Sequence, residues 1–127
     1  MPAPLDPPQL DPRTDIGHVH LKVAGLERAL AFNRDVLGFG VIGRLGDQAA
    51  FLSAGGYHHH IGLNTWESRG GSPPPRGSTG LYHVAIRYPT RAALASALRA
   101  LIERHYPMGV EALDLDDLLA AATIERP

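Results

Sequence analysis

Histidine is the residue type through which this sequence is best equipped to do chemistry. Three consecutive histidines occupy positions 58–60, within the stretch GYHHHIGLN at 56–64. Two more histidines lie in HVH at 18–20, and another begins HVAIRY at 83–88. Imidazole is a common metal ligand and carries protons near neutral pH. The chain has no cysteine, so any metal must be held by His, Asp or Glu.

Strand parity indicates which histidines share a surface, because side chains alternate between the two faces of a strand. The stretches 16–23, 57–65 and 81–88 each read as a strand with one apolar face and one polar face. The polar faces carry His18, His20 and Lys22 on the first strand, His58, His60, Gly62 and Asn64 on the second, and His83, Ala85 and Arg87 on the third. His59 falls on the opposite, apolar face, where we expect a structural role.

Five imidazoles on these polar faces would be costly in a dry core. An unpartnered buried polar group costs roughly 1–3 kcal/mol, whereas the total stability of a domain is only about 5–15 kcal/mol. We therefore expect the polar faces to line a wet pocket or a metal site.

Composition and charge exclude several other kinds of function. The 127 residues are 44% hydrophobic and carry a net charge of −1 without a block of Lys or Arg, so nucleic acid is not an expected partner. The N-terminus has neither the basic nor the apolar region of a signal peptide, and no apolar run approaches the ~20 residues of a membrane span. We expect a cytoplasmic protein without membrane contact.

The order of the expected elements predicts a βαβββ unit. The strand at 16–23 is followed by an amphipathic helix over 26–38, which Gly38 ends, and then by strands at 39–45, 48–53 and 57–65. After a Gly- and Pro-rich connector, a strand at 81–88 leads to a second helix for which Thr90 is a suitable N-cap. HVHLKV and HVAIRY begin alike, 65 residues apart, and each precedes an amphipathic helix, which indicates an internal repeat.

Three stretches together carry a resemblance to a known family: IGHVHLKVAGLERALAFNRDVLGF, GGYHHHIGLNTW and GLYHVAIRYPTRAALASALRALIE. They resemble the vicinal oxygen chelate superfamily of glyoxalases, bleomycin-resistance proteins and extradiol dioxygenases, and most of all its small catechol-2,3-dioxygenase-like branch. The resemblance implies an α+β fold of paired βαβββ modules that enclose a divalent metal.

On this frame we expect five segments and a shortened second module, since only 22 residues follow His105, whereas the family's remaining strands need about 35–45. Either this module is truncated, or a stretch around Met108 to Leu113 is missing from the sequence. The segments are a Pro-rich arm (1–15), a first module (16–67), a connector (68–80), a second, truncated module (81–113) and a C-terminal tail (114–127).

The resemblance also implies roles for individual residues. His18 and His83 match the family's metal-ligating histidines, and His60 matches a histidine that acts as acid or base beside the metal. The position that bears a carboxylate ligand in glyoxalases is Gly62 here, which argues against a glyoxalase-type ligand set. Glu111, in the stretch GVE at 109–111, is the best candidate for a third, carboxylate ligand. We expect His20, His58 and Asn64 to line the substrate pocket or to orient the ligands.

Two histidines and one carboxylate form the ligand set of non-haem Fe(II) oxygenases. The expected activity is therefore Fe(II)-dependent, extradiol-type dioxygenation of a catechol-like small molecule, with Mn, Zn or Ni as other metals that the site would accept. Two alternatives stay open: a glyoxalase-type isomerase or lyase that uses the metal as a Lewis acid, and a metal-free protein that binds drugs. The edges of an incomplete sheet would favour a homodimer.

Overall fold

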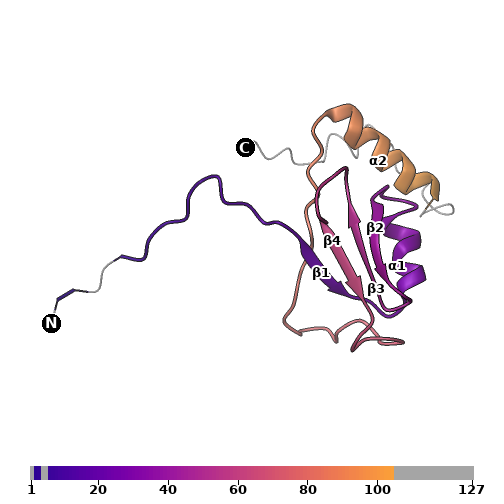
Figure 1. Ribbon diagram of the computed structural model, residues 1–127, viewed down its shortest axis with the longest axis horizontal. Coiled ribbons are helices and arrows are strands. Elements are labelled where there is room, and N and C mark those ends of the chain that lie inside the picture. The colour runs from indigo at the N-terminus through magenta and orange to yellow at the C-terminus, as the bar shows by residue number, and fades with distance from the viewer. Residues whose placement is uncertain (1, 4–5, 105–127) are drawn as a thin grey trace.

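The structure, a computed structural model, describes residues 2–3 and 6–104 of the chain and contains one mixed sheet (Figure 1). Its strands are β1 (Val19–Lys22), β2 (Gly40–Leu45), β3 (Ala49–Ser53) and β4 (Ile61–Asn64). Their order in the sheet is β1-β4-β3-β2, with β1 parallel to β4 and the other pairs antiparallel. The fold is α+β, and residues 19–64 form the βαβββ module that the sequence predicts. No helix within the described residues is long and apolar enough to cross a membrane.

Helix α1 (Leu26–Asn33) covers one face of the sheet and forms the core with it (Figure 1). Leu26 and Leu30 of the helix pack with the buried sheet residues Ala50, Leu52, Ile61 and Leu63. The half-buried residues Val19 and Leu21 of β1 pack against this cluster, while His20 and Lys22 of the same strand are exposed. The alternation predicted for this strand is therefore confirmed, and its imidazole lies on the face that the helix leaves open.

The first helix is shorter than the predicted range of 26–38. After Asn33 the hydrogen bonding is mixed. The amides of Asp35 and Leu37 bond to carbonyls five residues earlier, whereas those of Arg34, Val36 and Gly38 still bond to carbonyls four residues earlier. A left-handed Gly38 (φ 89°) then directs the chain into β2. The regular helix ends at Asn33, and a partly helical turn continues to Gly38. Gly38 therefore ends the helical turn, as predicted, but not the regular helix.

The prediction of a strand at 81–88 is wrong, because this segment, although described by the structure, forms no strand. Its residues are exposed except for the half-buried Tyr88. A strand needs a ladder partner for its backbone groups, and the four strands of the sheet pair only with one another.

Helix α2 (Arg91–Arg104) follows this segment, as predicted. The Thr90 hydroxyl accepts a hydrogen bond from the Ala93 amide at 3.1 Å, which confirms Thr90 as the N-cap. The rest of the second module and the tail, including Glu111, lie outside the described residues.

Candidate metal centre and adjoining pocket

The topology of the sheet brings the histidine-bearing segments together. Strands β1 and β4 are parallel neighbours in register, with Val19 opposite Ile61. The residues that lead into these two strands, His18 before β1 and the three histidines before β4, therefore meet at the same end of the sheet. Residues 54–60 form bends and turns rather than strand, so the ring positions there follow the loop and not strand alternation.

His18, His58 and His59 form a cluster with the spacing of a metal site. One ligand nitrogen from each lies within 4.8 Å of the others, and the ring centroids are 4.3 Å apart for His18–His59 and 4.8 Å for His58–His59. The two Nδ1 atoms of His58 and His59 are 3.2 Å apart. Two neighbouring ligand nitrogens bound at about 2.0–2.1 Å to one metal, at tetrahedral or octahedral angles, are about 2.8–3.4 Å apart. The His58–His59 pair has this spacing, and the imidazoles are of a type that suits a divalent ion, but nitrogens as far apart as 4.8 Å would have to move closer to share one.

Exposure of the cluster leaves room for further ligands. His18 and His58 are exposed and His59 is half-buried, so solvent or a small molecule can reach an ion held by the three imidazoles. A site with open positions is typical of catalytic rather than structural metal centres.

The position of His59 differs from the one predicted by strand parity, which placed this residue on the apolar face toward the helix. Its ring contacts Phe51 (5.2 Å between centroids) and His18 instead. Phe51 is half-buried and lies between the core residues Ala50 and Leu52 along β3, so it points to the face opposite α1. The expectation failed because residues 57–60 are not a strand.

His60 is held separately, at the mouth of a cavity. Its Nδ1 accepts a hydrogen bond from the Ala54 amide at 3.1 Å and lies 3.3 Å from the Ser53 hydroxyl. Its ring packs against Tyr57 (4.4 Å) and more distantly against Phe39 (6.2 Å). Nothing in the sequence pattern pointed to Ser53, Ala54 or Tyr57 as neighbours of this histidine, because their approach depends on the loop at 54–60.

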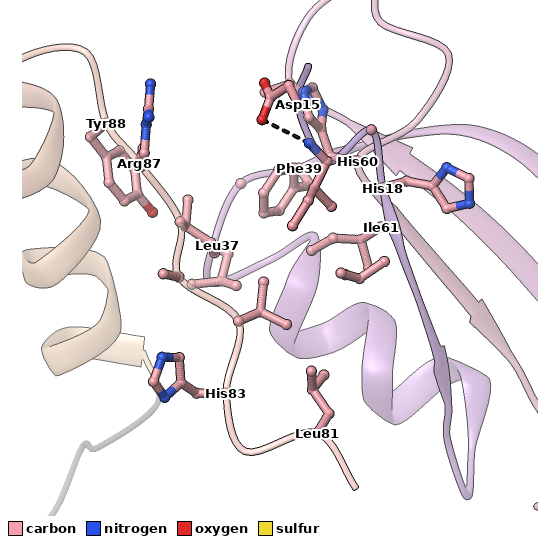
Figure 2. Close-up of a pocket in the computed structure, with 18 of the residues that line it drawn as sticks. Asp15, His18, Leu37, Phe39, His60, Ile61, Leu81, His83, Arg87 and Tyr88 are labelled. Carbon is pink, nitrogen blue, oxygen red and sulfur yellow. Dashed lines mark hydrogen bonds between the residues drawn. The ribbon is translucent and has the colours of Figure 1, made fainter. Parts of the chain in front are cut away.

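The cavity beside His60 has a volume of about 940 Å³ and separates the sheet from the segment before α2. Its walls come from residues 15–19, 37–39, 81 and 83–89 with Ala54, His60 and Ile61, and they are mainly apolar, with Asp15 and Arg87 as charged groups. Burial raises the pKa of the Tyr88 phenol on this wall. Figure 2 shows Leu37, Phe39 and Ile61 between the two sides.

His18 and His83 both line this cavity, but the structure does not bring their rings together. Figure 2 shows the two imidazoles directed away from each other, on opposite sides of the cavity. Within the described residues, His18 is grouped with His58 and His59 rather than with His83. The carboxylate expected from Glu111 cannot be placed, because that residue lies outside the described range.

The other residues expected at the pocket lie elsewhere on the sheet. The exposed His20 lies over Gly62 and contacts the rings of Trp66 (5.7 Å) and Phe51 (6.0 Å). Asn64 is buried, and its Oδ1 accepts a hydrogen bond from the Trp66 amide at 3.1 Å. Neither residue lines the cavity. His58, by contrast, belongs to the histidine cluster.

Comparison with known proteins gives two findings. Residues 15–122 match the Glyoxalase/Bleomycin resistance protein/Dioxygenase superfamily. Over 82 residues the chain is 49% identical to a protein of Bacillus subtilis (strain 168) named catechol-2,3-dioxygenase. That match covers 64% of this chain but only 29% of the relative, so the chain spans less than a third of the relative's length.

Proposed function

Because the chain belongs to the Glyoxalase/Bleomycin resistance protein/Dioxygenase superfamily, we propose that it acts as a metal-dependent dioxygenase on a catechol-like small molecule. The observation that carries this proposal is the 49% identity with the catechol-2,3-dioxygenase. One fold can host many reactions, so the fold alone does not identify the activity. The cluster of three histidines supports a metal-dependent reaction.

The three imidazoles that would hold the metal in this proposal are those of the cluster: His18, His58 and His59. When bound, Fe(II) would supply open coordination positions and the redox chemistry needed with O₂. The apolar walls of the cavity would exclude water around an aromatic ring, and Arg87 offers a positive charge to an ionised oxygen. His60 lines the same cavity, and its ring accepts a hydrogen bond from the Ala54 amide.

The activity can be tested by anaerobic loading with Fe(II), addition of catechol and then exposure to air. We expect oxygen uptake together with the yellow absorbance of a ring-opened product, and neither when Zn(II) replaces Fe(II). Protein that is folded but binds no Fe(II) and leaves catechols unchanged would rule the proposal out. Turnover with Zn(II), Ni(II) or Co(II) without oxygen uptake would point to the isomerase or lyase reaction instead.

The ligand set is tested apart from activity, by Co(II) titration of single variants followed in the visible spectrum. We expect His18→Ala and His59→Ala to lower the affinity by at least about tenfold, since each removes one of three ligands. His20→Ala is the matched control, because this exposed histidine lies outside the cluster. A loss of affinity in His83→Ala as large as that in His18→Ala, with His59→Ala unchanged, would favour the set of His18, His83 and a carboxylate.

A further inference from the structure

Arg87 brings a permanent positive charge to the cavity described above. It lies in the segment before α2, and Figure 2 shows it beside Tyr88, across the cavity from His18. Four other described arginines form ion pairs with carboxylates: Arg13, Arg34, Arg44 and Arg69. No described side chain forms an ion pair or a hydrogen bond with Arg87. Its guanidinium is therefore free to bind a ligand.

Asp15, the other charged group that was named on the cavity walls, does not pair with this guanidinium. It belongs to the segment that leads into β1, whereas Arg87 belongs to the wall before α2. One of its oxygens, Oδ1, already accepts a hydrogen bond from the Ile16 amide at 2.8 Å. An anionic group of a ligand would therefore reach Arg87 without displacing a described carboxylate of the chain.

The wall that carries Arg87 also exposes apolar side chains. Leu81, Val84 and Ile86 line the cavity and are 64%, 39% and 37% exposed. An apolar molecule that enters the cavity removes this surface from water, which favours its binding. The cavity, at about 940 Å³, is near the upper end of the range of about 300–1,000 Å³ for small-molecule sites. A bare catechol ring would leave much of this space to water, so a longer ligand fits better.

We infer that Arg87 is a specificity-determining residue, which selects ligands whose apolar body ends in a carboxylate. The guanidinium presents parallel N–H donors that match the two oxygens of a carboxylate. The apolar body of the ligand covers the exposed side chains of the same wall.

The same site narrows the class of substrate. With its two hydroxyls toward His18 and its carboxylate toward Arg87, the substrate is a catechol that carries an acidic side chain on its ring. This step to a catechol rests on the proposed function, whereas the preference for an anionic, apolar ligand does not.

The preference for charge is tested in metal-free protein with two ligands that cannot chelate a metal, 4-phenylbutyrate and its neutral amide, 4-phenylbutanamide. The two molecules have nearly the same size and shape, so the ratio of their affinities isolates the effect of the charge. We expect wild type to bind the carboxylate about three- to tenfold more tightly, a modest ratio for a charged hydrogen bond because Arg87 is exposed. Titration followed by the methyl NMR signals of Ile61 and Ile86 measures both affinities and places the ligand in the cavity.

Arg87→Gln should remove the preference and leave the affinity for the amide unchanged, whereas Arg87→Lys should keep part of the preference. Arg91→Gln is the matched control, because it removes the same charge from an exposed residue that does not line the cavity. The inference would be overturned if wild type bound neither ligand or both equally, or if Arg91→Gln reduced the preference as much as Arg87→Gln. A wild-type dimer that takes up neither ligand and that Leu81→Ser dissociates would also overturn it, because a second copy would then cover this wall.

The class of substrate is measured separately, by oxygen uptake of Fe(II)-loaded protein with 3,4-dihydroxyphenylacetate and with its neutral amide. We expect kcat/KM to favour the acid in wild type, and Arg87→Gln to lose this preference mainly through a higher KM for the acid. If neither compound is turned over but 4-phenylbutyrate is still preferred to its amide, the proposed function fails and the Arg87 site stands. If both compounds are turned over equally and 4-phenylbutyrate is not preferred, the Arg87 site fails and the proposed function stands.

Discussion

At the scale of single residues, Gly62 sets the position of the His20 ring. The two residues are paired across β4 and β1, and a Cβ built on Gly62 would lie 2.7 Å from Nδ1 of His20. No contact of that length is tolerated, so the imidazole lies flat on the sheet only because position 62 has no side chain. This arrangement also places the ring beside Trp66.

We predict that Gly62→Ala moves the His20 ring off the sheet and away from Trp66. Trp66 fluorescence should change, because the imidazole no longer packs at 5.7 Å from the indole. Gly43→Ala is the matched control, since its Cβ would meet Phe51 at an ordinary 3.8 Å. Alanine in a strand is favoured over glycine by roughly 0.5–1 kcal/mol, so Gly43→Ala should be the more stable variant. Identical spectra and stabilities for the two variants would contradict this account.

Tyr88 gives a residue-scale prediction on pH. Burial raises its pKa above the ordinary value of about 10. The stabilising effect of the neutral phenol is full below pH ~10 and is lost as the pH rises through the raised folded-state pKa. We expect the free energy of unfolding to fall with pH above ~10 less steeply in Tyr88→Phe than in wild type. Urea unfolding between pH 9 and pH 11 measures this, with the exposed Tyr82 replaced by Phe as the control; the same slope in all three proteins would contradict the prediction.

The sequence predicted correctly which face a side chain lies on only where the residue belongs to a regular strand. Parity placed His20 and Lys22 correctly, because β1 is a strand. It misplaced His59, because alternation has no meaning in the bends that precede β4. The neighbours of His60 lay beyond sequence reasoning as well, since only the folded loop brings the Ala54 amide and the Ser53 hydroxyl near its ring.

At the scale of elements, local sequence signals predicted where a helix starts, whereas the formation of a strand depended on pairing with a distant segment. The Thr90 cap of α2 involves only neighbours in sequence, so it could be read directly. The segment at 81–88 has the composition of a strand, yet a strand exists only when a second chain segment accepts its hydrogen bonds. Its expected partners in the second module lie outside the described residues.

We predict that Thr90→Ala destabilises the first turn of α2 by about 1 kcal/mol, the usual cost of losing an N-cap. The loss should appear as about fivefold faster hydrogen exchange at the Ala93 amide, which now donates to the Thr90 hydroxyl. Thr90→Ser keeps the hydroxyl and is the control. Exchange that is unchanged at this amide, or equally faster in the Ser variant, would show that the cap contributes little.

At the scale of the whole molecule, the described core lies entirely within the first module. The buried hydrophobic residues fall between Leu26 and Leu63, and neither the segment at 81–88 nor α2 adds a fully buried one. The second part instead contributes one wall of the cavity, through residues 81 and 83–89. The described core therefore belongs to the first module alone, whereas the cavity is formed by both parts of the chain.

A single cut in the connector separates these two contributions. Arg76 is exposed and is followed by Gly77 rather than proline, so trypsin can cleave there, whereas Arg69 is paired with Asp47 at 3.3 Å. We expect limited trypsin treatment to cleave first after Arg76 and to leave the sheet of residues 19–64 folded, as judged by the dispersed amide spectrum of the N-terminal fragment. Arg76→Gln, which removes the site, is the control.

The same cleavage should abolish binding of 4-nitrocatechol once the fragments are separated, because the wall formed by residues 81 and 83–89 is lost. Co(II) affinity should change little, since His18, His58 and His59 all belong to the N-terminal fragment. Unfolding of that fragment on cleavage would show that the second part stabilises the first. A parallel loss of Co(II) affinity from a folded fragment would show that the metal needs a ligand beyond residue 76, and His83 would then be the described histidine to test.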